Sequence, residues 1–255
     1  MAIGNFSLLA AAARRMVVDV MTMALTRLEG KVAVITGGAS GIGESTARLF
    51  SKHGAKVVIA DVQDDLAESV CRDLSPSSTS FVHCDVTKEE DVENVVQTAT
   101  NKYGKLDIMF NNAGIAGMVK PNILDNDKIE FEQVIRVNLV GAFLGIKHAA
   151  RVMIPVGKGL VRNTAVELGQ HGIRVNCVSP YIVSTPLVKE FFKLDDDKLH
   201  GVYSNLKGGV LKAEDIAKAA LYLGSDESKY VSGHNLLVDG GFTIVNAGFC
   251  MFEQA

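Results

Sequence analysis

A glycine-rich run, Thr36–Gly43, has residue types and spacing that suit a nucleotide site. It reads Thr-Gly-Gly-Ala-Ser-Gly-Ile-Gly and lies between a short apolar stretch and an amphipathic one. The first glycine of the fingerprint permits a tight turn, the second lets the backbone approach a pyrophosphate, and the third lets a helix pack closely on a strand. Free N–H groups at the start of that helix can then face phosphates. The predicted cofactor contacts in this run are Gly37, Ser40, Gly41, Ile42 and Gly43.

Asp61 follows the second apolar stretch, where a carboxylate can accept hydrogen bonds from the ribose hydroxyls of an adenosine. A 2′-phosphate there would meet like-charge repulsion, and the neighbours Gly38, Ala39 and Val62 offer no compensating cation. The sequence therefore favours NAD over NADP. An aspartate after a strand can also serve as a helix cap, and that alternative stays open. Asp85-Val86 follows the third apolar stretch and is predicted to meet the adenine edge.

The elements that must position these residues alternate along the chain. Short, non-alternating apolar runs suit strands covered on both faces, and the amphipathic stretches between them suit crossover helices. The predicted strands are Val32–Thr36, Val57–Ala60, Ser80–His83, Leu106–Asn111, Arg174–Val178 and Asn235–Val238. The predicted helices are Ile42–His53, Asp64–Leu74, Glu89–Tyr103, Lys128–Met153, Leu160–Gln170 and Ala213–Leu223. The pattern predicts an α/β fold with one doubly wound, Rossmann-type parallel sheet.

The alternation breaks after the helix that ends at Met153. Only Val156–Gly159 separates Pro155 from the next helix, so one strand is missing. Parallel strands need crossovers of a dozen or more residues, which makes two successive helices out of pattern. We therefore expect a sheet that lacks one central strand and part of the following helix. A helical hairpin insertion is the alternative, and a direct pairing of Arg174–Val178 with Leu106–Asn111 is a hypothesis for how the sheet closes.

Several ordered motifs together resemble the short-chain dehydrogenase/reductase family, from Leu28 onward. They are the glycine run, Asp61, Cys84-Asp85-Val86, Asn111–Gly114, Val137-Asn138 and Val238–Phe242. The phrases His148–Pro155 and Asn163–Gly169 are similar to plant members that oxidise secondary alcohols of terpenoids and lignans, such as secoisolariciresinol, xanthoxin and borneol dehydrogenases. The resemblance implies oxidation of a secondary alcohol to a ketone with NAD.

The resemblance also assigns roles to particular residues. Asn112, Ala113 and Gly114 match a loop beside the adenosine, and Ile182 and Thr185 match the segment that grips the nicotinamide carboxamide. Asn138 matches a catalytic asparagine that holds a water in a proton relay; a buried polar residue satisfied by helix backbone is the alternative. Tyr181 stands where the family usually has glycine, so the resemblance does not predict the backbone conformation at this position.

The family's catalytic serine, tyrosine and lysine are not found at their expected place, between Pro155 and Leu160. In relatives a lysine and bound NAD⁺ lower the pKa of the tyrosine, which is otherwise near 10. Tyr203 and Lys207 have the Tyr-x-x-x-Lys spacing, but Gly208-Gly209 argues against the helix that would bring the two side chains together. Coincidence is the favoured interpretation of that pair.

Composition excludes several other classes of function. Net charge is -3 with 47% hydrophobic residues, so no basic field predicts nucleic acid or an anionic membrane as partner. No apolar run is long enough to span a membrane, and no metal site is predicted. The four cysteines show no paired spacing and are expected to be buried, reduced thiols.

Residues 1–22 are expected to be an extension before one domain, 23–255. The apolar stretch Phe6–Ala13 has no basic region before it, which argues against a secretory signal. Arg14 and Arg15 with a single acid, Asp19, leave a weak organelle transit peptide as the alternative to a cytoplasmic protein.

Three hypotheses for function follow. The chain is a working alcohol dehydrogenase with recruited residues, a non-catalytic NAD-binding partner of full-length relatives, or a poorly folded splice or gene-model product. In relatives subunits associate through the helix matched by Lys128–Met153 and the next one. The resemblance leaves a homo- or hetero-oligomer open, but the second of these interface helices is truncated here. Little or no activity is expected of the chain alone.

Overall fold

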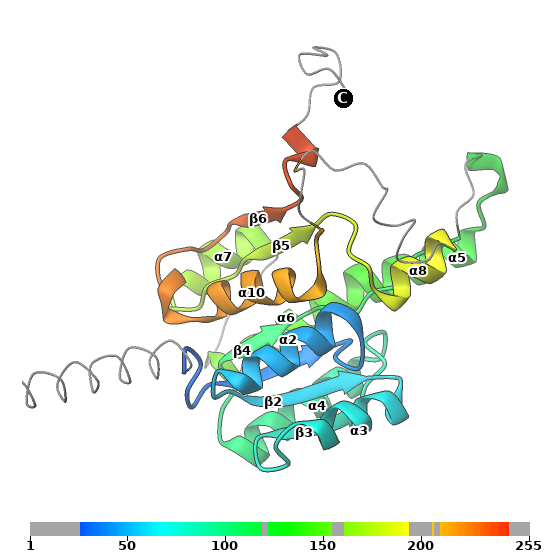
Figure 1. Cartoon of the computed structure of the whole chain (residues 1–255). Helices are drawn as coiled ribbons and strands as arrows, with labels where there is room; N and C mark the ends of the chain where they lie inside the picture. The colour runs from blue at the N-terminus through cyan, green and yellow to red at the C-terminus, as the bar shows by residue number, and fades with distance from the viewer. Residues whose placement is uncertain (1–25, 119–121, 155–160, 194–205, 207–209, 245–255) are drawn as a thin grey trace, which may run out of the picture.

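The computed structural model describes residues 26–118, 122–154, 161–193, 206 and 210–244. Four parallel strands form the first sheet in the order β3-β2-β1-β4 (Figure 1). Their bounds are β1 Val32–Thr36, β2 Lys56–Asp61, β3 Thr79–His83 and β4 Ile108–Phe110. The α/β class and the parallel sheet predicted from the sequence are confirmed. In the described part of the chain, no helix is both long and apolar enough to cross a membrane.

The crossover helices cover both faces of this sheet. They are α2 Gly41–Lys52, α3 Asp64–Asp73, α4 Glu89–Tyr103 and a long helix made of α5 Lys128–Ile135, a π-helical segment Arg136–Gly141 and α6 Ala142–Met153. Successive side chains of a strand point to opposite faces, so β1 contributes to two cores. Ala33 and Ile35 pack in one, with Phe50 of α2. Val32 and Val34 pack in the other, with α4 and α6.

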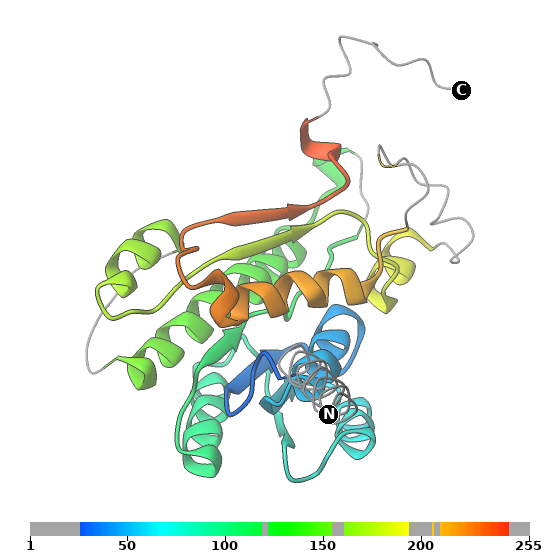
Figure 2. The same ribbon diagram turned by 60° about the vertical axis from the view of Figure 1, so that its left-hand side comes forward.

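A second, two-stranded parallel sheet holds the remaining strands, β5 Cys177–Pro180 and β6 Asn235–Val238. Its helices are α7 Val161–Gly169, α8 Pro186–Phe192 and α10 Ala213–Gly224, and short 3₁₀ turns include η3 Asp226–Ser228 and η4 Phe242–Ile244. Figures 1 and 2 show the second sheet beside α10, which also packs against α2 of the first. The single sheet expected from the sequence is therefore divided in two.

The hypothesis that the chain closes the sheet across the missing strand is wrong. Among the described strands, β4 pairs only with β1, and β5 pairs only with β6. The reason lies in helix packing: Ala220 and Leu221 of α10 belong to the core between α2 and the first sheet. Since α10 also contacts β5 and β6, it fixes where the second sheet can lie, and β5 does not reach β4.

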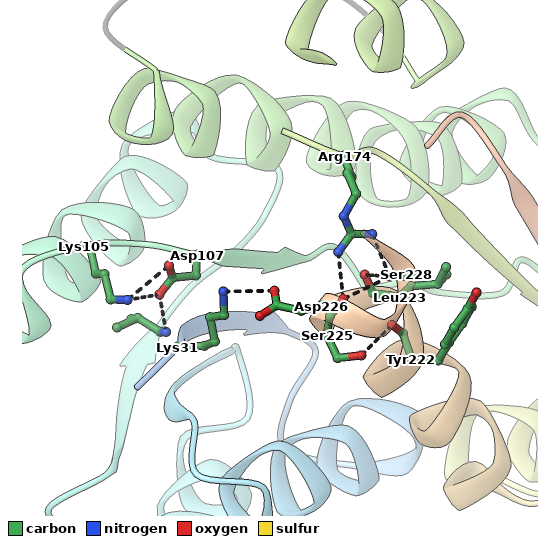
Figure 3. Close-up of polar contacts among 10 residues, drawn as sticks. Lys31, Lys105, Asp107, Arg174, Tyr222, Leu223, Ser225, Asp226 and Ser228 are labelled. Carbon is green, nitrogen blue, oxygen red and sulfur yellow. Dashed lines mark hydrogen bonds and ion pairs between the residues drawn. The ribbon is translucent and has the colours of Figure 1, made fainter. Parts of the chain in front are cut away.

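A polar cluster at the amino ends of the strands joins the two sheets through η3 (Figure 3). Lys31, before β1, forms an ion pair with Asp226 at 3.4 Å. On the other side Arg174, before β5, donates from Nη1 to Ser228 Oγ at 2.8 Å and from Nη2 to the Ser225 carbonyl at 3.2 Å. The η3 turn, which follows α10, thus connects the two sheets at the amino ends of β1 and β5.

Most predicted elements agree with the structure to within two residues. The largest difference is in β5, which begins at Cys177 rather than Arg174, because Arg174 is used in the η3 cluster. Helix α8 and the π-helical segment were not predicted. Residues 155–160, where the hairpin alternative falls, and residues 1–25, which include the expected N-terminal extension, lie outside the described residues.

Candidate cofactor site

The glycine run forms the tight strand-to-helix turn that its spacing predicts. Gly37 and Gly41 have φ of +65° and +57°, a region that side-chain-bearing residues rarely adopt. A Cβ on Gly43 would lie 2.0 Å from the Gly37 carbonyl oxygen, so helix α2 can approach the turn only because residue 43 is glycine. Ser40 is the N-cap of α2 but makes no side-chain cap hydrogen bond, and Ser40 and Ile42 are both half-buried. The turn has the closeness of backbone that a pyrophosphate site needs.

Asp61 ends β2 and is bound to the glycine turn. Its Oδ2 accepts a hydrogen bond from the Ala39 N–H at 2.9 Å, and its Oδ1 accepts one from the Gln63 N–H at 3.0 Å. The residue is 5% exposed, whereas its neighbour Val62 is 55% exposed. The N-cap of α3 is Gln63, so the helix-cap alternative for Asp61 is wrong. A buried carboxylate therefore lies directly beside the glycine turn.

Asp85 and Val86 follow β3. Asp85 Oδ1 accepts hydrogen bonds from the Thr87 N–H at 3.0 Å and the Thr87 hydroxyl at 2.8 Å. Burial alone would raise the pKa of Asp85, but these bonds and the nearby cations Lys88 and Arg136 outweigh it and lower the pKa. Val86 is buried, and a Cβ on Gly141 would lie 2.7 Å from its Cγ2, so the long helix passes close to this strand end.

The loop after β4 is fastened to the glycine turn. The Asn112 side-chain amide donates to the carbonyls of Thr36 and Gly37 at 3.0 and 3.1 Å. The Thr36 hydroxyl accepts from the N–H groups of Asn112 and Ala113, both at 3.0 Å. Thr36 was quoted in the motif but not predicted as a site residue; its position directly before Gly37 is the signal that could have identified it.

Asn138 lies in the π-helical segment, and its amide is bound to the same loop. Its Oδ1 accepts from the Ile115 N–H, and its Nδ2 donates to the Ile115 carbonyl, each at 2.9 Å. The side chain is exposed, not buried, and its partner is loop rather than helix backbone, so the alternative expected from the sequence is wrong in both respects. Gly114 lies nearby, since a Cβ there would be 3.5 Å from Asn138 Oδ1. π-Helical segments are frequent at functional sites.

The segment after β5 reaches the glycine turn from the second sheet. Thr185 is 7% exposed and caps α8, with its hydroxyl accepting from the Val188 N–H at 3.3 Å. A Cβ on Gly41 would lie 3.2 Å from Thr185, so the two motifs meet. Ile182, two residues after β5, is half-buried. Tyr181, the departure from the family pattern, packs its ring 4.4 Å from that of Phe242.

Other candidate residues can be placed only in part. Tyr203 and Lys207 lie outside the described residues. Within the described part of the chain, no cluster of three or more His, Cys, Asp or Glu could hold a metal ion. Cys84 is buried, which raises the pKa of its thiol to about 12, while Cys71 and Cys177 are half-buried free thiols. Cys71 and Cys177 are therefore less buried than expected.

The parallel sheet, the glycine turn and the carboxylate at the end of β2 define a Rossmann-type α/β protein. Comparison with known proteins narrows the class. Residues 31–161 match the profile described as short chain dehydrogenase, and residues 157–243 match one described as Enoyl-(Acyl carrier protein) reductase. The chain belongs to the short-chain dehydrogenase family, whose members are typically NAD(P)-dependent oxidoreductases.

Several curated relatives are plant enzymes. The chain is 59% identical to the mitochondrial borneol dehydrogenase of Lavandula x intermedia over 258 residues, covering 90% of this chain and 96% of the relative. It is 50% identical to secoisolariciresinol dehydrogenase of Forsythia intermedia, covering 92% and 97%. It is 45% identical to xanthoxin dehydrogenase of Arabidopsis thaliana, covering 89% and 94%. The resemblance to this plant group is confirmed.

Solved structures give the same fold. Levodione reductase superposes with a TM-score of 0.77 at 30% identity, covering 86% of this chain and all of that one. A short-chain type dehydrogenase/reductase from Mycobacterium marinum gives a TM-score of 0.77 at 28% identity, covering 88% of this chain.

Proposed function

We propose that this chain binds NAD(H) in preference to NADP(H) and, alone, transfers hydride slowly or not at all. The observation that carries the first half is the buried Asp61 carboxylate, 2.9 Å from the Ala39 N–H at the glycine turn. A carboxylate there favours ribose hydroxyls and opposes a 2′-phosphate. When bound, the dinucleotide would supply the hydride acceptor or donor, and the residues on this chain would hold its adenosine and pyrophosphate.

The second half of the proposal concerns the catalytic serine, tyrosine and lysine. The alignment with the lavender relative is 258 positions long. It includes 90% of the 255 residues of this chain, which is about 230 residues. About 28 aligned positions of the relative therefore have no counterpart in this chain. The two family profiles meet at residues 157–161, where the sequence pattern breaks. Both observations support the loss of the family's catalytic segment. General acid–base catalysis typically contributes about 10²–10⁴-fold, so its loss leaves little turnover.

The substrate class of the lineage is a secondary alcohol of terpenoid or lignan type, oxidised to a ketone. The names of the borneol and secoisolariciresinol dehydrogenases support this class. Leu187 and Phe192 of α8 are 42% and 40% exposed, apolar enough to meet such a ligand.

We place the chain in the cytoplasm, with organelle import as the alternative because the lavender relative is named as mitochondrial. Fluorescent fusions with and without residues 1–22 separate these two.

A fluorescence titration with NADH and NADPH tests the cofactor proposal. We expect NADH to bind more tightly than NADPH, and Asp61→Asn to weaken NADH binding by about 10–100-fold, the value of a charge-assisted hydrogen bond. Asp65→Asn, an exposed carboxylate on α3, is the matched control and should change nothing. Equal binding of both dinucleotides, or an Asp61→Asn effect no larger than the control, would refute the proposal.

Turnover with borneol and NAD⁺ tests the low activity. We expect a rate at least about 10²-fold below that of the intact lavender relative measured alongside. Tyr203→Phe should leave any residual rate unchanged. A rapid reaction abolished by Tyr203→Phe would instead establish a working dehydrogenase with recruited residues.

A non-catalytic partner of intact relatives is the second candidate. The long helix exposes Phe131, Leu139 and Phe143 by 65, 54 and 41%, an apolar surface that suits association with another subunit. Co-purification of the chain with an intact relative would support the partner hypothesis. Elution of the chain as a monomer in size-exclusion chromatography with that relative present would oppose this hypothesis. A melt without a cooperative transition would favour the third hypothesis, a poorly folded product.

A further inference from the structure

β4 and β5 are edge strands of the two sheets among the described strands. β4 is half-buried along its whole length, Ile108–Phe110, whereas all five residues of β1 are buried. β5 is half-buried from Cys177 to Ser179, with Pro180 exposed. In the part of the chain that is described, β4 and β5 each have a partner on one side only. Unpaired edges present free N–H and C=O groups to any extended chain.

The helices on both faces are shared by the two sheets, although the strands are not. On one face α10 packs with α2 and also contacts β5 and β6. On the other face Ala150 and Ile154, at the end of α6, form one cluster with Leu168 of α7 and with Ile173 and Val175 before β5. Together with the η3 cluster in Figure 3, these contacts connect the two sheets on both faces and at one end.

The long helix also carries an exposed apolar stripe. Ile135, Leu139 and Phe143 recur every four residues on the long helix and are 37, 54 and 41% exposed. The end of this helix is covered, because Ala150 and Ile154 pack against Leu168. The stripe thus begins where the cover given by α7 ends. Covering it takes a further helical segment with an apolar face.

We propose that the break accepts, in trans, a strand-then-helix segment of an intact short-chain dehydrogenase. The strand would lie between β4 and β5, parallel to both, and the helix would cover Ile135, Leu139 and Phe143. The order is dictated by the fold, since a parallel strand is followed by a crossover helix on one face. The length also agrees: about 28 aligned positions of the lavender relative lack a counterpart here, enough for a strand of about six residues and a helix of about 12.

This proposal adds a partner to the proposed function and does not depend on cofactor binding. A strand added at a sheet edge gains main-chain hydrogen bonds, and here it gains them on two sides. The segment would also bring the serine, tyrosine and lysine that the family resemblance implies. Its docking is nevertheless a binding event that can be measured without NAD⁺ or alcohol.

A labelled 28-residue peptide copied from the unmatched positions of the lavender borneol dehydrogenase tests the proposal by fluorescence anisotropy. We expect saturable 1:1 binding to the full chain. Leu139→Asp should raise Kd at least about tenfold, whereas the matched control Leu66→Asp, 48% exposed on α3 at the other end of the sheet, should leave it unchanged. A proline in the middle of the peptide's strand should also raise Kd at least about tenfold.

Absence of saturable binding would overturn the proposal, as would equal effects of Leu139→Asp and Leu66→Asp. Thermal melts of both variants verify that each is folded, and both sites are exposed in the structure. An NADH titration on the same samples separates the two proposals. A chain that binds NADH but not the peptide contradicts only this inference, and one that binds the peptide but not NADH contradicts only the cofactor proposal.

Discussion

Asn112 donates two hydrogen bonds to Thr36, one from its backbone and one from its side chain. The Asn112 backbone N–H donates to the Thr36 hydroxyl, and the Asn112 side-chain amide donates to the Thr36 carbonyl, both at 3.0 Å. The pair connects the end of β1 to the end of β4. The glycine turn follows β1 and the loop beside it follows β4, so the pair connects the two halves of the candidate cofactor site.

Replacing Thr36 with valine should loosen this connection. Valine keeps the shape but removes the oxygen that accepts from Asn112 and Ala113, which leaves two N–H groups without that partner. We expect a loss of about 1–3 kcal/mol in the free energy of unfolding and weaker NADH binding, measured by urea denaturation and fluorescence titration. Thr36→Ser restores the hydroxyl and serves as the control; equal losses in both variants would contradict the role of the hydroxyl.

Gly43→Ala should damage the cofactor turn. The added Cβ would lie 2.0 Å from the Gly37 carbonyl oxygen and 2.6 Å from Asn112 Nδ2, so helix α2 must shift. We expect a loss of about 1–3 kcal/mol in stability and at least a tenfold rise in the Kd for NADH. Gly169→Ala is the control, since nothing lies within 4 Å of a Cβ there. If both variants bind NADH as the parent does, the close approach at Gly43 is unimportant.

His53 should make stability depend on pH below neutrality. Burial, followed by the nearby cations Arg27 and Lys52, lowers the pKa of His53 from its usual 6.5. The unfolded chain therefore takes up a proton below about pH 6.5, where folded His53 does so only at lower pH, and unfolding is favoured as pH falls. The stability is fully present above that range and decreases below it.

His53→Asn should reduce this dependence. We expect the loss in unfolding free energy between about pH 7.5 and 5.5 to be smaller in the variant than in the parent, measured by urea denaturation at each pH. His171→Asn, an exposed histidine, should follow the parent curve. A His53→Asn curve parallel to the parent would show that His53 does not titrate differently on folding.

Arg174→Lys should weaken the connection between the sheets. The guanidinium makes one hydrogen bond to Ser228 and others to the carbonyls of Ser225 and Val231, a fork that an ammonium cannot reproduce. We expect a loss of about 2–3 kcal/mol and faster hydrogen exchange in β5 and β6 than in β1. Arg72→Lys, whose exposed pair with Glu68 is 3.5 Å long, should cost under about 1 kcal/mol. An equal change in hydrogen exchange in both sheets of Arg174→Lys would contradict the proposed role of Arg174.

Local patterns in the sequence were sufficient for most elements and for the nucleotide half of the site. Strand β1 and helix α4 have the predicted bounds, because apolar runs and helical periodicity are set by nearby residues. The glycines after three predicted helices, Gly54, Gly104 and Gly172, have φ of +88°, +82° and +73°, as a helix-ending glycine requires. The position of Asp61 beside the turn followed from the same kind of spacing.

Contacts between distant residues were not predictable in this way. The division into two sheets depends on α10 and on the bonds from Arg174 to residues more than fifty positions away. The role of Thr36 depends on Asn112, 76 positions further on. Likewise, no local pattern indicated that the Asn138 amide would bind the Ile115 backbone through both its oxygen and its nitrogen. Periodicity reports which face of an element is apolar but not which partner it meets.

The half-buried margins of β4 and β5 also have a consequence for handling the protein. An edge strand that can pair with one extended segment can also pair with the edge strand of another newly synthesised copy of the same chain. Slow expression at low temperature should therefore give a larger fraction of non-aggregated protein than rapid expression at higher temperature. The aggregated fraction should bind dyes that detect cross-β structure.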